Sequence, residues 1–519
     1  MKTTTFLKST MILTIATLLS KVLGSLFRIP LQNIAGDEVL GIFTLVYPVY
    51  MVILILSVAG IPLAISKLIA EERASNQMMN IRRIYVTASL LGLLFGLVSF
   101  GSIVVFSEPI SLLLGGKDTY PALVLVSVSL IFAPYMAVYR GYFQGFSDMN
   151  PTAYSQVIEQ LVRAVFVIAL AYVLSSQGFS NSWTAGGVMA GSICGVLASL
   201  LYLRVIYVRS PYTIRQNISY SFSTFIIWSR SILRISIPIA IGTLSMALLN
   251  FVDSLTVPSS LNHKLTDPDL SIPYLYGIYG RGLSLVQIAT VFATSIILPL
   301  IPLLTSKMKE NDRRGMLETI EQTSKMTHLI AWPAAMGLVF LAVPMNVALF
   351  TDAEGSFIIA ILGASSIFTS FTIVGTGILQ GIDRVRQAAW IIITGVLLKI
   401  LLNVWLVNWI GIEGAAFSTL IVYIYLTLGN GIFIFRQIPF TVLDRSHIKI
   451  ISASLLMGAV IGFPPFIYSM EYWGRPFSFV YVVSAIIVGA LIYGAALYFT
   501  KAVDRQLLQQ LPFAGKYIK

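Results

Sequence analysis

The chain has 519 residues, of which 57% are hydrophobic and only 11% are charged. Soluble domains carry about 45–50% apolar and about 25% charged residues, so this composition excludes an ordinary soluble protein and indicates one that crosses a membrane repeatedly. The formal net charge is +12, and the single cysteine, Cys194, excludes both an internal disulfide and a site with several thiolate ligands.

Fourteen apolar stretches are long enough, at about 17–25 residues each, to cross a bilayer as helices. They predict an all-α polytopic membrane protein with fourteen transmembrane helices. In chain order these stretches cover residues 7–31, 40–61, 82–106, 119–140, 152–175, 183–207, 229–253, 277–305, 326–350, 356–380, 387–407, 412–435, 448–468 and 477–500.

The basic residues between these stretches set the expected orientation. With the N-terminus in the cytoplasm, the inner connections hold Lys67, Arg73, Arg82, Arg83, Arg204, Arg209, Arg215, Lys307, Lys309, Arg313, Arg314, Arg384, Arg386, Arg436 and Arg445. Of the basic residues, the outer connections hold almost only Lys117, Lys264 and Arg475, beside the acids Asp37, Glu38, Asp118, Asp267, Asp269, Asp352 and Glu471. This asymmetry follows the positive-inside rule, so it explains the net charge without nucleic acid. It predicts a multi-pass membrane protein with both termini cytoplasmic; the resemblance described below adds that the membrane is the bacterial cytoplasmic membrane.

Two halves of the chain share motifs at a constant spacing. "RGYFQG" at 140–145 and "GTGILQG" at 375–381 both end a predicted helix on its inner side. An offset of 236 residues (377 − 141) relates Gly41 to Gly277, Gly141 to Gly377, Gly145 to Gly381 and Arg163 to Lys399. Because six helices per copy is an even number, the copies are expected to be parallel repeats. The predicted organisation is an N-lobe of helices 1–6 (1–215), a C-lobe of helices 7–12 (216–440), and helices 13–14 with a cytoplasmic tail (441–519).

Cations inside the predicted helices outnumber acids. The cations are Lys21, Arg28, Arg163, Arg234, Arg281 and Lys399, and the acids are Glu159 and Asp253. A charge at the bilayer centre costs about 2.5–3.5 kcal/mol, so such residues usually face a bundle interior or a water-filled cavity. The excess of cations therefore predicts a cavity that binds an anionic substrate.

The six cations are expected to differ in role. Arg28 and Arg281 lie near the outer ends of their helices, and their guanidinium groups suit a phosphate because each offers two parallel hydrogen bonds. Lys21 lies two turns before Arg28 on the same helix face. Lys21 and Lys399 are less selective point charges for the same ligand.

Two positions leave alternatives open. Glu159 and Arg163 are four residues apart, so they either neutralise each other or serve function. Arg234 either reaches the inner headgroups or contacts the substrate. Glu159 and Asp253 are the only candidates for coupling to an ion gradient.

Three stretches carry a family resemblance: "SKVLGSLFRIPLQNIAGDEVLGIF" from Ser20, "AGIPLAISKLIAE" from Ala59, and "YGIYGRGLSLVQIATVFATSIILPLIPLL" from Tyr276. Together with the paired Gln-Gly turns, they resemble the SpoVB-like branch of the multidrug/oligosaccharidyl-lipid/polysaccharide exporter superfamily, close to the MurJ lipid II flippases. The resemblance covers nearly the whole chain.

That resemblance implies two lobes with alternating access around a cationic cavity. The implied activity moves an undecaprenyl-diphosphate-linked saccharide, most simply lipid II, to the outer leaflet for cell-wall or spore-cortex synthesis. Arg28 and Arg281 look like counterparts of the implicated arginines in the first and eighth MurJ helices. MurJ sequences usually follow the first of these with an acid, whereas here Ile29 and Pro30 follow Arg28, which leaves the cargo open.

Two other functions compete with this one. A cation-type multidrug exporter of the same superfamily would need buried acids, and only Glu159 and Asp253 are available. A polyprenyl-dependent membrane glycosyltransferase would need an acidic metal site, but the "DPD" at 267–269 lies in a proline-containing loop where a turn is expected.

The sequence therefore predicts a transporter with no catalytic residue, cofactor, metal or nucleic-acid partner. His263, His328 and His447 are far apart in the sequence, and no phosphate-binding loop for ATP occurs. The expected partners are the lipid-linked oligosaccharide, membrane lipids and wall-synthesis enzymes. The energy is expected to come from the membrane potential, an ion gradient or consumption of the product.

Overall fold

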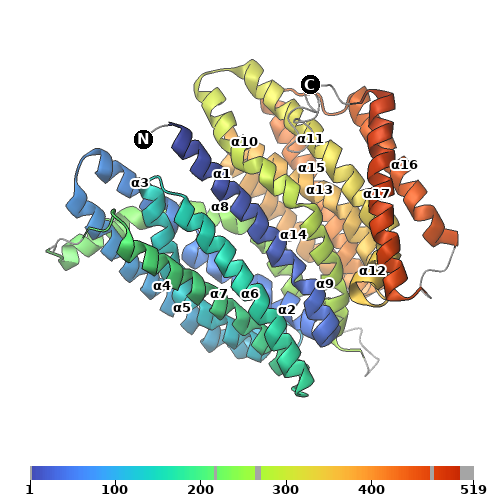
Figure 1. The fold of residues 1–519 in the computed structure, drawn as a ribbon, viewed down its shortest axis with the longest axis horizontal. Coiled ribbons are helices and arrows are strands. Elements are labelled where there is room, and N and C mark those ends of the chain that lie inside the picture. The colour runs from blue at the N-terminus through green and yellow to red at the C-terminus, as the bar shows by residue number, and fades with distance from the viewer. Residues whose placement is uncertain (1–2, 215–218, 263–269, 468–472, 503–519) are drawn as a thin grey trace. The chain divides into compact units, whose positions relative to one another are not determined.

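The computed structural model describes residues 3–214, 219–262, 270–467 and 473–502, and these ranges are almost entirely helical (Figure 1). The helices are α1 (Thr3–Leu26), α2 (Arg28–Val58), α3 (Ile61–Ala74), α4 (Met78–Leu113), α5 (Tyr120–Gly145), α6 (Asn150–Ser176), α7 (Asn181–Arg209), α8 (Phe222–Asn262), α9 (Ile272–Ala289), α10 (Val291–Lys309), α11 (Arg313–Phe340), α12 (Ala342–Phe350), α13 (Ser356–Gly381), α14 (Val385–Ile410), α15 (Ile412–Gln437), α16 (Arg445–Ile467) and α17 (Arg475–Thr500). A short 3-10 turn, η1 (Lys117–Thr119), precedes α5.

The prediction of an all-α polytopic membrane protein is confirmed. Among the described residues, twelve helical stretches are long and apolar enough to span a bilayer, or thirteen if α11 and α12, bent by 76°, form one span. The difference from fourteen lies mainly in the first stretch, Ile12–Ala74, which counts once although it has 63 residues. At about 1.5 Å per residue it would extend about 95 Å, three times the hydrocarbon thickness of a bilayer.

Gly36 interrupts that long stretch. Its φ of +83° lies in the left-handed region that glycine adopts readily, whereas Phe27, between α1 and α2, keeps helical angles. The break therefore falls in the gap left between the first two predicted spans, 7–31 and 40–61. Fourteen spans remain the prediction.

The chain divides into two compact units, an N-terminal unit (Met1–Gly277) and a C-terminal unit (Ile278–Lys519). In the N-terminal unit the central helix is α2, which buries 16 of its 31 residues. An apolar helix buried on all sides is expected at the centre of a bundle. The predicted three-part organisation places α8 with the C-lobe, whereas α8 packs within the N-terminal unit here.

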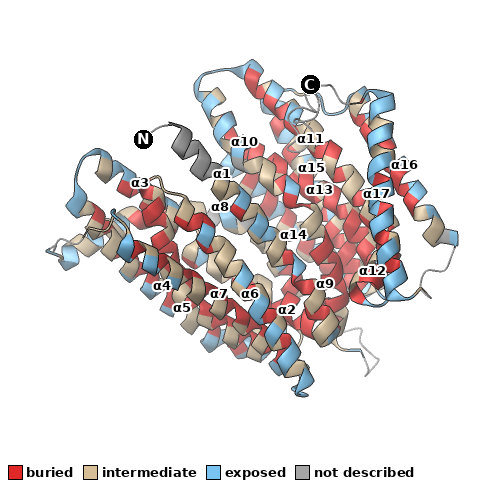
Figure 2. Ribbon diagram, in the orientation of Figure 1, coloured by how far each residue is buried: buried red, intermediate tan, exposed pale blue. Residues whose placement is uncertain are grey.

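The C-terminal unit shows the same contrast between central and outer helices. In α13, 19 of 26 residues are buried, whereas α17 buries only Ser478, Val482, Ala485 and Gly489 (Figure 2). Those four lie on one stripe of the helix, and its other faces carry large exposed apolar side chains such as Phe479 and Leu491. This pattern is the one expected of a helix that faces lipid.

Two glycines related by the 236-residue offset touch each other in the N-terminal unit. A Cβ added to Gly41 would lie 1.7 Å from the carbonyl oxygen of Pro273 and 2.8 Å from the nitrogen of Gly277. A Cβ on Gly277 would lie 2.0 Å from the carbonyl oxygen of Asp37. This contact brings the start of α9 against α2 within the N-terminal unit, and the parallel repeat stays a prediction.

A buried arginine fixes the turn between α12 and α13. Arg281 is fully buried, and its two terminal nitrogens donate to the carboxylate of Asp352 at 2.7 and 2.9 Å. Asn346 accepts from Arg281 at 3.1 Å and donates to the carbonyl of Glu354 at 2.7 Å. These contacts tie α9, α12 and the turn at 351–355 together inside the C-terminal unit.

The glycine contact predicts a steric test. Gly41→Ala should lower the thermal unfolding midpoint in detergent, because its methyl group has no room against the Pro273 carbonyl and overpacking costs about 1–3 kcal/mol. Gly101→Ala is the matched control, since nothing lies within 4 Å of a Cβ there. Equal midpoints for the two variants would contradict the close backbone contact.

The arginine clamp predicts a large loss of stability in Asp352→Ala. Removing the Asp352 carboxylate, which is itself 46% exposed, leaves the fully buried Arg281 without its charged partner, and the loss of charge-assisted hydrogen bonds costs about 1.5–3 kcal/mol. The folded fraction after heating, measured by size-exclusion chromatography in detergent, should fall well below wild type. Glu318→Ala removes the partner of an exposed pair with Arg314 and should change little. A heat-resistant Asp352→Ala protein would show that the clamp does not hold the turn.

A candidate anion-binding site

Two buried arginines share one set of aromatic rings in the N-terminal unit. We call Phe27, Phe43 and Tyr47 the aromatic box. The guanidinium carbon of Arg28 lies 5.5 Å from the Phe43 ring centre and 5.7 Å from the Tyr47 ring centre. The guanidinium carbon of Arg163 lies 5.0 Å from the Tyr47 ring centre and 5.6 Å from the Phe27 ring centre.

The break at Gly36 explains how the box forms. Fifteen residues separate Arg28 from Phe43, about 22 Å along a straight helix. Because the chain turns at Gly36, the segment before the break lies against the segment after it. Phe27 then packs edge-on against Phe43 at 5.5 Å, and Phe43 stacks on Tyr47 at 5.4 Å. Phe43 and Tyr47 are four residues apart, so they share one face of α2.

The charges of these arginines are matched by ring faces rather than by acids. Arg28 is 7% and Arg163 is 6% exposed, and neither forms an ion pair with any described residue. Arg163 donates one long hydrogen bond of 3.5 Å to the Tyr47 hydroxyl. Cation–π contacts are worth about 0.5–2 kcal/mol each, less than the desolvation of a buried ion. The arrangement therefore presents two guanidinium groups whose remaining N–H donors can bind an anion.

Glu159 forms its ion pair with Arg140 and acts on Arg163 only as a charge nearby. Its carboxylate accepts a hydrogen bond of 2.7 Å from Arg140, in the "RGYFQG" motif of α5. Ser155 and Ser199 also accept from Arg140, at 3.0 and 3.2 Å. Three acceptors converge on Arg140, so the carboxylate turns towards α5 and leaves Arg163 to the aromatic box.

Lys21 and Arg28 differ in environment although the sequence places them on one helix face. Lys21 is exposed, whereas Arg28 is buried. α1 packs on α6 instead, where Thr17 donates to Gln156 at 3.1 Å and Gly24 lies close to Gln160. Lys21 is therefore accessible beside the box rather than part of it.

The two cations predicted in the C-terminal unit already have partners within it. Lys399 is 2% exposed and donates to the Thr419 hydroxyl at 2.7 Å, which also bonds to the Tyr279 hydroxyl at 2.8 Å. Arg281 is held by Asp352 as described above. A substrate role for either residue stays a prediction.

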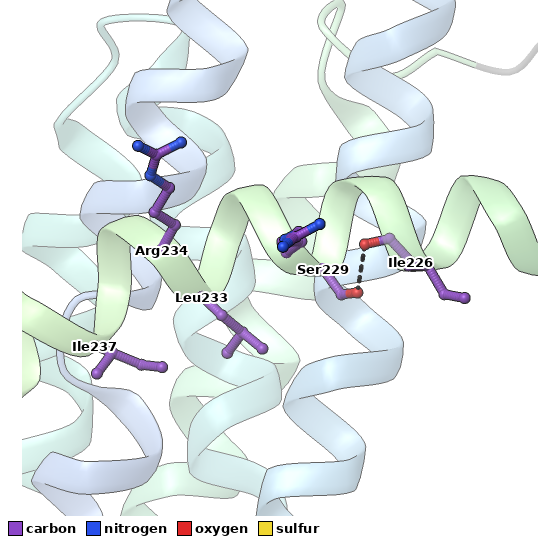
Figure 3. A pocket seen from close by; sticks show the side chains of 6 residues that line it. Ile226, Ser229, Leu233, Arg234 and Ile237 are labelled. Carbon is purple, nitrogen blue, oxygen red and sulfur yellow. Dashed lines mark hydrogen bonds between the residues drawn. The ribbon is translucent and has the colours of Figure 1, made fainter.

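Arg234 and Asp253 lie on the same helix in different surroundings. Arg234 is exposed and lines an open pocket of about 660 Å³ on α8 together with Arg230 (Figure 3). Asp253 is 2% exposed and lies close enough to Tyr276 to interact with it electrostatically.

The aromatic box and the roles of Arg140 and Arg230 were not predicted from the sequence. The spacing of Phe43 and Tyr47, four residues apart on a helix, was the only signal in the sequence for the box.

Two histidines that are distant in the sequence meet in the C-terminal unit. The rings of His328 and His447 are 4.5 Å apart, and each ring's Nδ1 accepts a hydrogen bond, from Trp332 and from the backbone of Asp444 respectively. Burial raises the pKa of Asp444. Hydrogen bonds from the backbone N–H groups of His447 and Ser446 lower it by more than burial raises it, so the pKa lies below its ordinary value. The described residues contain no group of three or more metal-ligating side chains.

His263, the "DPD" motif, Glu471 and Arg215 lie outside the described residues.

Comparison with known proteins agrees with this architecture. Residues 6–308, more than half of the chain, match the family described as polysaccharide biosynthesis protein. The chain is 28% identical to the uncharacterized membrane protein YabM of Bacillus subtilis (strain 168), over 98% of this chain and 95% of that one. It is 25% identical to the lipid II flippase MurJ of the same organism (98% and 97%) and 25% identical to its stage V sporulation protein B (99% of each).

Solved structures show the same fold. A lipid II flippase MurJ in an inward closed conformation superposes with a TM-score of 0.68 at 17% identity, covering 95% of this chain and 99% of that one. An inward-facing multidrug transporter of the MATE family superposes with a TM-score of 0.62 at 16% identity, covering 82% and 95%. With the matched family and the membrane-spanning helices, these findings place the chain among transporters rather than enzymes. The chain belongs to the polysaccharide biosynthesis protein family, within the multidrug/oligosaccharidyl-lipid/polysaccharide exporter superfamily of multi-pass membrane transporters.

Proposed function

We propose that this protein is an alternating-access flippase that moves an undecaprenyl-diphosphate-linked saccharide from the inner to the outer leaflet. The observation that carries the proposal is the pair of buried arginines, Arg28 and Arg163, on one aromatic box without an acid partner. The relatives add support, because two of them are named a lipid II flippase and a sporulation protein. Lipid II for cell-wall or spore-cortex synthesis is the cargo we favour.

The chemistry of the box suits a diphosphate. Guanidinium groups stay charged when desolvated and bind phosphate oxygens through paired hydrogen bonds, which a single ammonium cannot reproduce. A diphosphate offers enough oxygens for two guanidinium groups at once. The rings hold both side chains in place before the ligand arrives, so little conformational freedom is lost on binding.

The other predicted cations fit the proposal as secondary contacts. Arg281 would exchange Asp352 for a phosphate oxygen, and Lys399 would exchange the Thr419 hydroxyl, when the transporter changes conformation. Lys21, exposed beside the box, would attract the headgroup. Both exchanges replace an internal partner by the substrate, so these two charges stay matched throughout the cycle.

The membrane potential is sufficient as a driving force in this scheme. Moving one charge through 100 mV is worth about 2.3 kcal/mol, and an inside-negative potential drives a diphosphate outwards. Glu159 is held by Arg140 at 2.7 Å, so coupling through its protonation would first have to break that pair. Asp253, buried on α8, is the second candidate for ion coupling.

A cation-type multidrug exporter is the second candidate, favoured by the superposition on MATE transporters. It would need a buried carboxylate to bind an organic cation. Of the two acids inside the predicted spans, Glu159 is paired with Arg140 and Asp253 lies beside Tyr276. The site with accessible binding groups is cationic, which favours an anion.

Transport measurements on Arg28→Gln and Arg163→Gln test the proposal. A charge-assisted hydrogen bond is worth about 1.5–3 kcal/mol, so each variant should slow transport by about 10-fold to 100-fold. Proteoliposomes with fluorescent lipid II, read by a quencher added outside, measure the rate. Arg204→Gln, which removes a half-exposed arginine bonded to Tyr139 away from the box, is the control and should transport as wild type does.

The possible outcomes separate site from cargo. Normal transport by both box variants would refute the site. No transport of lipid II by the wild type, with transport of another polyprenyl-diphosphate saccharide, would refute lipid II as cargo and keep the flippase. Transport of organic cations alone would favour the multidrug exporter.

Substitutions of Tyr47 test the role of the aromatic face. Tyr47→Phe removes only the hydroxyl and its 3.5 Å contact, so transport should stay within about 3-fold of wild type. Tyr47→Leu removes the ring shared by both arginines, and the loss of cation–π contacts worth about 0.5–2 kcal/mol should slow transport by about 3-fold to 30-fold. Equal rates for the two variants would show that the ring does not position the arginines.

A further inference from the structure

One face of α8 carries two arginines among apolar side chains. Arg230 and Arg234 lie four residues apart, and the pocket they line is formed entirely by α8. Its lining residues recur every three or four positions, which places them on one helix face. They are Ile226, Ser229, Arg230, Leu233, Arg234 and Ile237.

The opposite face of α8 packs within the N-terminal unit. Ile232, Ser236 and Ala240 are buried there. A Cβ on Gly60, between α2 and α3, would lie only 2.5 Å from the carbonyl oxygen of Ser236, so the two backbones touch. The arginine face therefore points away from the unit to which α8 belongs.

Nothing in the described chain neutralises these two arginines. Neither forms a hydrogen bond or ion pair with a described residue, and the nearest acid that follows them on α8 is Asp253. Like charges four residues apart repel each other, and each cation in an apolar span costs about 2.5–3.5 kcal/mol. The span here is Phe222–Leu244. An anion from the surroundings would offset both costs.

The position along α8 suits a lipid headgroup. Arg230 and Arg234 lie about 12 and 18 Å from the start of the helix, at about 1.5 Å per residue. The predicted orientation puts that end in the cytoplasm, and long arginine side chains reach back towards the headgroups. The inner leaflet of a bacterial membrane is rich in anionic lipids, which basic residues attract.

We propose that this face of α8 binds the phosphate headgroup of an anionic phospholipid of the inner leaflet. The two guanidinium groups bind the phosphate, and an acyl chain lies along Ile226, Leu233 and Ile237. In Figure 3 the Arg234 side chain extends to one edge of the helix and the side chains of Leu233 and Ile237 to the other, so charged and apolar contacts are separated as in such a lipid. The Ser229 hydroxyl donates to the Ile226 carbonyl at 3.0 Å, which leaves recognition to the arginines.

This site is independent of the proposed transport activity. It decides between the two alternatives for Arg234 in favour of a headgroup, and it adds Arg230, which the sequence did not single out. It also separates the resident lipid on α8 from the aromatic box, which we assign to the substrate.

Native mass spectrometry of the full chain with added lipids tests the site. The probes are phosphatidylglycerol and, for comparison, zwitterionic phosphatidylcholine. Wild type should bind at least one phosphatidylglycerol preferentially, and Arg230→Gln with Arg234→Gln should weaken that binding at least 10-fold. Arg384→Gln with Arg386→Gln removes two exposed arginines from the start of α14 and should leave it unchanged.

Three results would overturn the proposal: equal phosphatidylglycerol binding by wild type and the α8 variant, no preference over phosphatidylcholine, or displacement of phosphatidylglycerol only by a polyprenyl diphosphate. The last result would make this face a substrate site. Arg230→Lys with Arg234→Lys keeps both charges, folds with the least perturbation, and should retain most of the binding. Its loss of preference for phosphatidylglycerol would likewise overturn the assignment.

Discussion

The rest of the structure depends on one constraint, which is that every cation placed among apolar helices needs a compensating partner. For its buried cations the chain meets this need in three ways, whereas the exposed Arg230 and Arg234 have no partner among the described residues. Arg281 has a carboxylate, Lys399 has a hydroxyl, and Arg28 and Arg163 have ring faces. Ring faces compensate least, because they supply neither a full charge nor strong acceptors. The differences in compensation therefore distinguish side chains that hold the fold from side chains that remain able to bind.

Glycine places these partners within reach of one another. The left-handed angles of Gly36 turn the chain so that Phe27 and Arg28 lie against Phe43. The contact between Gly41 and the backbone near Gly277 brings α2 and the beginning of α9 together without intervening side chains. The aromatic box and the arginines beside it thus owe their geometry to backbone freedom and close approach as much as to the charged residues.

Hydropathy and spacing predicted much of the fold. The positions of the helices, the gap between the first two spans and the family all follow from patterns within short windows or from repeated motifs. The count of spans was less secure, because the stretch 12–74 hides breaks that depend on the backbone of two glycines, Gly36 and Gly60. The six cations could be predicted from the sequence, because a charged residue within a long apolar stretch is rare and easily identified.

Their partners could not be found in the same way. The spacing of Glu159 and Arg163 suggested a pair, but the distribution of acceptors around Arg140 on another helix decided the outcome. Asp352 lies 71 residues from Arg281, and no local rule connects them. The aromatic box combines residues before and after a helix break, and Arg163 reaches it from α6, so short-range sequence patterns could not predict that these residues meet.

The clamp between Arg281 and Asp352 also constrains how this chain can change through descent. Loss of Asp352 alone would leave the fully buried Arg281 charge without its carboxylate, which is costly, whereas loss of Arg281 alone would leave an Asp352 that water already reaches. The constraint is therefore one-sided, and Asp352 is expected to be kept wherever Arg281 is kept. A turn of five residues between two helices thereby ties the evolutionary history of α9 to that of α12 and α13.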